Sequence, residues 1–220
     1  MPHRIAQIRL VAAHPEVYEP CDDSFALVDA LLSDSANILS RNPTLCLEIG
    51  SGSGYVITSL ALILQEHRPP ASHFIATDIN PHALAATSQT LAAHGVTSAD
   101  LVQTDILNGM EDRLTGKVDL LVVNPPYVPT PEDEVGVEGL GSAWAGGENG
   151  RSVIDRILVV AERVLAADGW MYLVTLTENK PGEICRIMKG KGFGFRIVVQ
   201  RSTVEESLHI IKFWRQEAEA

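Results

Sequence analysis

The sequence is short of positive charge and has no paired cysteines. Its 220 residues include 17 lysines and arginines against 28 aspartates and glutamates, which gives a formal net charge of −11. A protein that binds nucleic acid directly neutralises phosphates with basic side chains, so this balance argues against such a partner. The cysteines form no C-x-x-C pair, and the seven histidines show no H-x-x-x-H spacing. The sequence therefore predicts neither a disulfide framework nor a metal site.

Long hydrophobic runs are also absent. The longest apolar stretch is Leu60–Leu64, and the N-terminal MPHRIAQIRL has no signal-peptide core. A helix that spans a bilayer needs about 20 apolar residues, so we expect no membrane segment and no secretory signal. With 45% hydrophobic and 20% charged residues, the composition is typical of a soluble globular protein. We expect a cytoplasmic protein, with the nucleus as a further compartment.

Strand and helix patterns alternate from about residue 23 to residue 190. Apolar and β-branched runs predict strands at 44–49, 73–77, 101–104, 118–123 and 170–176. Apolar residues at helical spacing predict helices at 22–39, with Asp22 or Asp23 as N-cap, and at 55–66, 81–94, 151–167 and 181–191. Two final strands, 195–200 and 208–213, are joined by a polar turn, so one of them runs antiparallel. This pattern predicts an α/β fold with a seven-stranded, mostly parallel sheet, a C-terminal antiparallel hairpin strand and helices on both faces.

A glycine loop follows the first predicted strand. The stretch LEIGSGSGY places Gly50, Gly52 and Gly54 at a strand-to-helix turn, where glycine lets the backbone approach a ligand closely. A dinucleotide site would have the spacing G-x-G-x-x-G, but position 55 is Tyr. Glu48 at the strand end would face a pyrophosphate badly, whereas it suits a ligand that carries an ammonium group. The loop alone leaves open a nucleotide-binding loop of another kind.

Acidic residues follow the second and third predicted strands. TDIN places Asp78 and Ile79 after the second strand, where a carboxylate can accept from both ribose hydroxyls; a helix cap ahead of Pro81 is the alternative. TDI places Asp105 and Ile106 after the third strand, with a solvated loop aspartate as the alternative. Open α/β sheets bind ligands at the carboxyl ends of their strands. Acidic strand ends around one glycine loop therefore favour a ligand site at this edge of the sheet.

The fourth predicted strand, 118–123, ends in Asn124, Pro125, Pro126 and Tyr127. A planar NH2 group, as in a glutamine amide or an adenine amine, is a poor nucleophile because its lone pair is delocalised. The Asn124 side-chain oxygen and the Pro125 carbonyl can accept its two hydrogens and fix the nitrogen opposite a methyl donor. The prolines stiffen the backbone, and Tyr127 can stack on the planar group. The alternative is a strand terminator with a buried aromatic ring.

Together, GSGSG, TDIN, TD and NPPY resemble the amino-methyltransferases with a [DNS]-PP-[YFW] motif. The flanking stretches VYEPCDDSF (17–25), EVGVEGLGSAWAGGENGR (134–151) and YLVT (172–175) resemble the HemK-like glutamine methyltransferases of eukaryotes and archaea. This resemblance implies a Rossmann-like class I methyltransferase fold. It also implies that the chain transfers a methyl group from S-adenosyl-L-methionine, which leaves as S-adenosyl-L-homocysteine. The implied acceptor is the N5 amide nitrogen of the glutamine in the Gly-Gly-Gln loop of the class I translation release factor.

The resemblance extends over residues 17–213 and implies a single methyltransferase domain over 1–220, with 1–16 as an N-terminal extension. It assigns the target amide to Asn124, Pro125, Pro126 and Tyr127, with a glycine-rich loop around 143–149 over the substrate. It implies that the cofactor site consists of Tyr18, Asp23, Ser24, Glu48, Gly50, Gly52, Gly54, Asp78, Ile79, Asp105, Ile106 and Asn124. Tyr18 is implied to shape the entrance with its neighbours Glu19 and Pro20.

Family members work with a small zinc-binding activator protein, so the resemblance implies such a partner here, with the release factor as protein substrate. The strand around Leu101–Thr104 is expected at an edge of the sheet. The sequence DLVQT contains no lysine or proline that would discourage strand pairing, so we expect the activator along this edge. An edge buried under a loop is the alternative.

Other acceptors and other activities remain open. The same pocket can take a lysine, although no obvious base lies near NPPY, or adenine N6 of DNA, which the acidic balance and the lack of a target-recognition domain disfavour. A nucleotide-binding oxidoreductase would need the glycine spacing that Tyr55 interrupts. A non-catalytic scaffold would show decayed motifs, and these motifs are intact.

Overall fold

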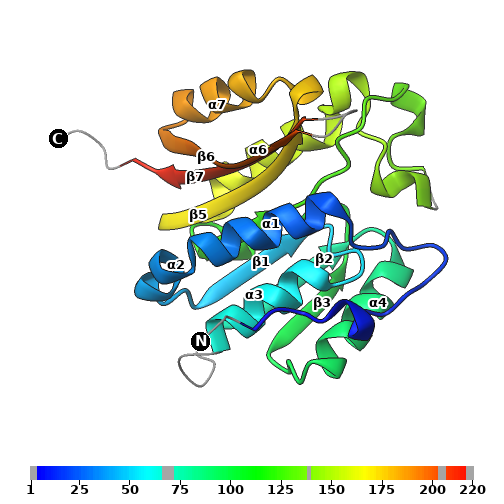
Figure 1. Ribbon diagram of the computed structural model, residues 1–220. Helices are drawn as coiled ribbons and strands as arrows, with labels where there is room; N and C mark the ends of the chain where they lie inside the picture. The colour runs from blue at the N-terminus through cyan, green and yellow to red at the C-terminus, as the bar shows by residue number, and fades with distance from the viewer. Residues whose placement is uncertain (1–3, 66–71, 138–139, 203–206, 217–220) are drawn as a thin grey trace.

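The computed structural model describes residues 4–65, 72–137, 140–202 and 207–216. Among them, one seven-stranded sheet has the strand order β3-β2-β1-β4-β5-β7-β6 (Figure 1). The strands are β1 (Leu45–Ile49), β2 (His73–Asp78), β3 (Ala99–Gln103), β4 (Val118–Val123), β5 (Leu165–Leu176), β6 (Phe193–Ser202) and β7 (Ser207–Arg215). All neighbours pair in parallel except β7, which is antiparallel to β5 and β6. The predicted fold class is therefore confirmed, with β7 as the antiparallel strand.

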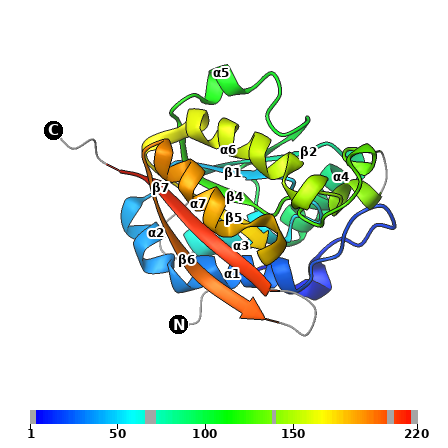
Figure 2. The same cartoon turned by 90° about the horizontal axis from the view of Figure 1, so that it is seen from above.

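Helices cover both faces of the sheet (Figures 1 and 2). The helices are α1 (Asp22–Ser33), α2 (Ser35–Arg41), α3 (Tyr55–Gln65), α4 (Pro81–Ala93), α5 (Glu111–Leu114), α6 (Ser152–Val164) and α7 (Pro181–Gly190). Because side chains alternate along each strand, β1 contributes Cys46 to the core under α1 and α3, and Leu47 to the core under α6 and α7. Each of the central strands thus has an apolar layer on both sides, as parallel sheets require.

The order of the strands fixes where a ligand can bind. The chain leaves β1 for β2 on one side, while β4 pairs with β1 on the other side, with Ile49 opposite Val123. Open α/β sheets bind ligands at the crevice that forms where the strand order reverses. The residues directly after β1 and β4 therefore lie side by side at the carboxyl edge of the sheet. The predicted edge position of β3 is also confirmed.

Two predicted helices have different limits in the structure. The helix predicted over 22–39 is divided at Asp34 into α1 and α2, and its N-cap is Cys21 instead of Asp22 or Asp23. Asp34 accepts hydrogen bonds from the Tyr172 hydroxyl and the Lys212 ammonium group, so contacts with β5 and β7 fix the break. These contacts come from distant parts of the chain, and the local apolar pattern does not predict them.

The helix predicted over 151–167 ends at Val164, and β5 begins at Leu165. Pairing of Leu165 with Val118 of β4 overrides the helical pattern. At Gly169 the backbone passes so close to β4 that a Cβ atom would lie 2.6 Å from the Val118 carbonyl oxygen.

The short helix α5 and the 3-10 turns η2 (Glu132–Glu134), η3 (Leu140–Ala143), η4 (Glu148–Gly150) and η5 (Thr177–Asn179) were not predicted. A further 3-10 turn, η1 (Ile8–Leu10), lies in the N-terminal segment. Of the predicted features, residue 66 at the end of the second helix and residues 203–206 of the polar turn lie outside the described residues, as do positions 1–3 of the extension and 138–139 of the glycine-rich loop. In the part of the chain that the structure describes, no helix is long and apolar enough to cross a membrane.

Candidate active site

A cavity of about 400 Å³ opens at the carboxyl ends of the parallel strands. This volume lies within the range of small-molecule and cofactor sites. Of the residues predicted for the site, all except Gly54 line the cavity: Tyr18, Asp23, Ser24, Glu48, Gly50, Gly52, Asp78, Ile79, Asp105, Ile106, Asn124, Pro125, Pro126 and Tyr127. The two groups of predicted residues, those for a cofactor and those for a methyl acceptor, therefore share one cavity.

The glycine loop is fixed to β2 by its backbone. The amides of Gly50 and Ser51 both donate to the Thr77 carbonyl, at 2.8 and 3.0 Å, and the Gly52 amide donates to Asp78 Oδ2 at 2.9 Å. Gly52 has a φ of +51°, and a Cβ atom there would meet no protein atom within 4 Å. A side chain at this position would therefore extend into free space beside the cavity wall.

Gly54 is a point of close packing and does not belong to the cavity lining. It begins the turn into α3, with a φ of +77°, and an added Cβ atom would lie 2.7 Å from the Thr87 Cα atom of α4. This distance is too short for any side chain, because backbone atoms on a packed helix cannot move aside cheaply. Close packing of the loop against α4 accounts for this glycine.

The two glycines therefore predict separable defects. We expect Gly54→Ala to lower the free energy of unfolding by about 2 to 5 kcal/mol, since it adds a steric clash to an unfavourable φ. Gly52→Ala should lower the free energy of unfolding by only about 1 to 2 kcal/mol. It should weaken ligand binding more strongly than Gly54→Ala does. Urea denaturation and cofactor titration of both variants check this. Equal losses of stability would contradict the assignment of Gly54 to packing.

Two carboxylates border the glycine loop. Glu48 is 1% exposed and its Oε2 accepts from the Ile57 amide at 3.0 Å; burial, opposed by this hydrogen bond and assisted by the nearby Asp78 charge, raises the pKa of Glu48 well above its usual value. Asp78 accepts from the amides of Gly52 and Asn80, each at 2.9 Å, while burial raises its pKa. The helix cap of α4 is Asn80, not Asp78. A cationic or hydroxyl-bearing ligand would stabilise both carboxylates in their charged form.

The end of the third strand brings together Ile106, Asp105 and one residue that was not predicted. Ile106 has a φ of +56°, which is rare for a β-branched residue and typical of strained functional positions. The Thr77 hydroxyl holds it by donating to its carbonyl at 2.9 Å. Asp105 forms an ion pair with Arg156 of α6, which also lines the cavity. Arg156 lies 51 residues further along the chain, and no local pattern marks it.

Asn124 presents a free acceptor at this site. Its Oδ1 atom is buried and has no hydrogen-bond partner among the described residues. Buried polar atoms without a partner are rare and destabilising, and at a cavity wall they point to an absent donor. A ligand that offers an N–H group would satisfy this atom. The observation agrees with the acceptor role predicted for Asn124.

Asp23 holds Asn124 and Tyr127 from the first turn of α1. It is 5% exposed, and its Oδ2 accepts from the Tyr127 hydroxyl at 2.7 Å. Burial alone would raise the pKa of Asp23, but hydrogen bonds from the side chains of Cys21, Tyr127 and Asn124 and from the Ser24 amide more than offset this effect and lower it. Because the Asn124 amide group donates to Asp23, its Oδ1 is the side-chain atom that remains without a partner. Asp23 therefore orients the NPPY motif.

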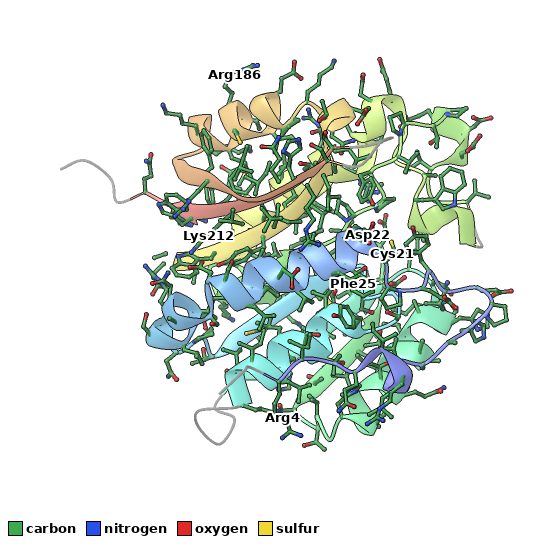
Figure 3. All side chains as sticks on the ribbon, in the orientation of Figure 1. Arg4, Cys21, Asp22, Phe25, Arg186 and Lys212 are labelled. Carbon is green, nitrogen blue, oxygen red and sulfur yellow. The ribbon has the colours of Figure 1, made fainter. Side chains whose placement is uncertain are left out.

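Apolar side chains surround the mouth of the cavity. Tyr18, Ile79 and Trp144 are exposed by 42%, 48% and 39%, and all three belong to its lining. Of the three residues expected at the entrance, Tyr18 lines the cavity, whereas Glu19 and Pro20 do not belong to its lining. Figure 3 shows the neighbouring Cys21 and Asp22 at the start of α1, at the end of the helix that faces the segment after β4.

The N-terminal segment adds part of the wall. Glu16 and Val17 line the cavity, and the Asn80 side chain donates to the Glu16 carbonyl at 2.7 Å. Upstream, the Ala6 amide donates to the Ser59 hydroxyl of α3 and the Ala12 amide to the Thr90 hydroxyl of α4. This segment, predicted only as an extension, runs across both helices (Figure 1). The segment is largely apolar, but its sequence alone does not indicate which helices it contacts.

Comparison with known proteins shows which family has this arrangement. Residues 22–138 match the methyltransferase small domain family. The human protein "Methyltransferase HEMK2" is 44% identical over 201 residues, which is 91% of each chain. The "eRF1 methyltransferase catalytic subunit mtq2" of Schizosaccharomyces pombe is 35% identical over 221 residues, 96% of this chain and 94% of that one.

Solved structures agree with the sequence relatives. The structure of the E. cuniculi Mtq2–Trm112 complex, responsible for the methylation of the translation termination factor eRF1, matches with a TM-score of 0.63 and 28% identity, over 91% of this chain and 99% of that chain. A ribosomal protein L11 methylase from Lactobacillus delbrueckii subsp. bulgaricus, at 16% identity and a TM-score of 0.61, covering 94% of this chain and 86% of its own, shares the fold. The chain thus belongs to the methyltransferase small domain family and is a methyltransferase.

Proposed function

We propose that this chain is the catalytic subunit of an S-adenosyl-L-methionine-dependent methyltransferase that modifies the side-chain amide nitrogen of a glutamine in a class I translation release factor. The observation that carries the proposal is the buried, unpartnered Oδ1 atom of Asn124 at the cavity wall. A primary amide supplies the N–H donor that this atom lacks. The relatives named for eRF1 methylation support the choice of a release factor as the substrate.

The residues of the cavity fit the proposed cofactor. Glu48 would face the ammonium group of its methionine part, Asp78 would accept from the ribose hydroxyls, and Ile106 would pack on the adenine with Asp105 near its amine. A cationic ligand would offset the unfavourable burial of Glu48, whose pKa is raised by that burial. When bound, S-adenosyl-L-methionine supplies an activated methyl group and leaves as S-adenosyl-L-homocysteine.

The chain's own contribution is to hold the acceptor nitrogen. The Asn124 Oδ1 atom and the Pro125 carbonyl accept the two amide hydrogens, and the Tyr127 ring covers the planar group. Two acceptors favour the tetrahedral character that the nitrogen gains as the new N–C bond forms. One hydrogen of the amide leaves as a proton after transfer, so no strong base is needed. Prolines 125 and 126 keep these acceptors in place without a loss of entropy at the moment of reaction.

Asp23 decides between an amide and an amine acceptor. A lysine ammonium group must lose a proton before it can attack, and the carboxylate that contacts the NPPY motif is Asp23. Its hydrogen bonds from Cys21, Tyr127 and Asn124 outweigh burial and lower its pKa, which makes it a weak base at neutral pH. The site therefore favours glutamine over lysine. Adenine in DNA is disfavoured by the net charge of −11.

We further propose that β3 receives a Trm112-like activator, with the complex in the cytoplasm where release factors act. β3 is an edge strand whose outer backbone groups have no strand partner among the described residues. Within β3, Leu101 and Val102 are half-buried, whereas Asp100 and Gln103 are exposed. The solved relative from E. cuniculi is itself a complex with Trm112, and strand addition is the recognition mode that an open edge permits.

The test is transfer of a labelled methyl group to purified release factor by the chain co-expressed with its activator. Mass spectrometry of the product should place the methyl group on the glutamine of the Gly-Gly-Gln loop. A release factor with that glutamine replaced by alanine is the control and should take up no label. Label on lysine alone, or transfer to DNA alone, would refute the proposal.

The pH dependence of kcat gives a second, independent check. The pKa of Asp23 is lowered, so its charged form is complete above the ordinary carboxyl pKa of about 3.9 and is lost only below it. An amide acceptor does not titrate, so we expect kcat to stay constant within about twofold from about pH 6.5 to 8.5. A lysine acceptor, with a pKa near 10.4, would instead give a rate that rises about tenfold per pH unit.

A further inference from the structure

Asn179 is a buried asparagine behind the NPPY motif with every polar atom of its side chain paired. It belongs to η5, directly after β5, and is 0% exposed. Its Oδ1 accepts from the Leu176 amide at 2.6 Å, while its Nδ2 donates to the carbonyls of Tyr127 at 2.7 Å and Asn149 at 3.0 Å. The side chain therefore joins the end of β5 to two separate loop segments. It does not line the cavity.

The segment 145–150 packs directly against the backbone that follows Asn124. Val128 and Ala145 form a β-bridge, in which the Val128 amide donates to Trp144 and the Gly146 amide to Val128. A Cβ atom at Gly146 would lie 2.8 Å from the Pro126 carbonyl oxygen, and one at Gly150 would lie 1.9 Å from the Tyr127 carbonyl oxygen. No side chain larger than hydrogen fits at either position. These glycines let the segment 145–150 pack directly on the backbone that follows Asn124. A mobile lid would not pack so closely.

Arg151 completes the attachment on the far side. It is 9% exposed, donates to the Asn179 carbonyl at 3.2 Å, and forms an ion pair with Asp155. Asn179 is thus held at its main chain by Arg151 and in turn holds Tyr127 and Asn149 with its side chain. The loop around 143–149, expected over the substrate, has two roles in the structure: Ala143 and Trp144 line the cavity, whereas 145–150 supports the catalytic turn.

We propose that Asn179 is a positioning residue for methyl transfer, which fixes the backbone of the turn Asn124–Tyr127 through the Tyr127 carbonyl. The inference rests on the proposed function of that turn as the holder of the acceptor nitrogen. Tyr127 is fixed at two points, its hydroxyl by Asp23 and its carbonyl by Asn179. Reaction geometry is sensitive to this, since a displacement of about 1 Å can reduce a rate about 100-fold.

The central test compares Asn179→Ala with Tyr172→Phe in the complex with the activator. Both variants remove hydrogen bonds of a fully buried side chain, but Tyr172 donates to Asp34, which does not line the cavity. We expect Asn179→Ala to lower kcat for the release factor between about 10-fold and 100-fold, with the Kd for S-adenosyl-L-homocysteine changed less than about threefold. Tyr172→Phe should keep kcat within about twofold. Measurements are made where circular dichroism shows both variants folded.

Asn179→Asp adds a readout that a purely structural role would not give. A carboxylate there still accepts from Leu176 but faces the Tyr127 carbonyl without a hydrogen, so kcat should be low at pH 8. Burial raises the pKa of such a carboxyl group, so lowering the pH favours the protonated form, which can donate again. The ratio of the variant's kcat to the wild-type kcat should therefore be several-fold higher at pH 6 than at pH 8. If Asn179→Ala does not fold, this variant and Gly146→Ala, which presses on the Pro126 carbonyl, replace it.

Hydrogen exchange separates failure of this inference from failure of the proposed function. Loss of Asn179 should raise amide exchange at Val128, whose N–H is bonded to Trp144, and Tyr172→Phe should not. Wild-type kcat in Asn179→Ala, or unchanged exchange at Val128, would overturn the positioning role. If the wild-type complex binds cofactor but methylates no release factor, the proposed function fails, and the exchange result alone then decides whether Asn179 holds the turn.

Discussion

Replacing Asn124 with alanine is expected to reduce kcat for methyl transfer by a factor of about 100 to 1,000. This is the range found when one preorganised hydrogen-bonding group aimed at the reacting atoms is removed. The variant deletes the acceptor Oδ1, which lies buried and unpartnered at the cavity wall. The remaining Pro125 carbonyl can hold only one of the two amide hydrogens. The nitrogen is then free to turn away from the methyl donor.

Cofactor binding should survive this change. The backbone amides and carboxylates that would hold the cofactor lie on β1, β2 and the glycine loop, where Gly52 donates to Asp78 and Ile57 to Glu48. None of these contacts passes through the Asn124 side chain. We therefore expect the Kd for S-adenosyl-L-homocysteine, measured by calorimetry, to change less than about fivefold, or about 1 kcal/mol.

The matched control is Asn108→Ala, an exposed asparagine that does not belong to the cavity lining. It should leave both kcat and the Kd unchanged. Full transfer activity in Asn124→Ala would remove the basis for an amide acceptor held by NPPY. A loss of cofactor binding in parallel with transfer would instead make Asn124 a cofactor ligand without a separate role in catalysis.

The positions that follow strands could be predicted from the sequence because their geometry is local. Gly50, Asp78 and Asn124 each directly follow or end a strand, and parallel pairing brings all carboxyl ends to one edge. The strand pattern therefore fixes their proximity without any knowledge of side-chain packing. Family resemblance supplied the identity of the acceptor, which the motif alone does not define.

Contacts between distant segments could not be predicted in this way. The bond from Tyr127 to Asp23 joins residues 104 positions apart, and the ion pair between Arg156 and Asp105 spans 51 positions. Neither has a periodic or spacing signal, since helix packing decides which side chains meet. For the same reason the sequence does not show that Asp23, predicted as a cofactor ligand, also bonds to Tyr127 and Asn124, or that Gly54 packs on α4 at Thr87.

Stability and catalysis are coupled at Asp23, which occupies the border between the core and the cavity. A buried carboxylate is unfavourable unless it is hydrogen-bonded, and here the donors are Cys21, Ser24, Tyr127 and Asn124. These donors offset the unfavourable burial of Asp23, and Asp23 in turn fixes the orientation of the donor groups. This arrangement ties the start of α1 to the end of β4, so a change at Asp23 should affect folding and turnover together.

Asp23→Asn is accordingly expected to lower kcat about 100-fold and the free energy of unfolding by about 1 to 3 kcal/mol. An asparagine has one acceptor oxygen and one NH2 group, so it cannot accept from Tyr127 on one side and from Ser24 and Cys21 on the other. One set of donors stays unpaired. The Asn124 amide also loses part of its anchor, and its NH2 group can rotate toward the target amide and repel it.

Two variants separate these effects from a general effect of charge. Asp22→Asn removes a charge from the same first turn of α1 at an exposed position, labelled in Figure 3, and should change kcat less than about twofold.

Tyr127→Phe keeps the ring but removes its bond to Asp23, and should lower kcat only about fivefold because Asn124 keeps its own bond to Asp23. If Asp23 acts through both residues, the double variant Asp23→Asn/Tyr127→Phe should be no slower than Asp23→Asn alone, since the bond that Tyr127→Phe removes is already disrupted. Strictly additive losses would show that Asp23 and Tyr127 act independently, and the orienting role of Asp23 would then be wrong.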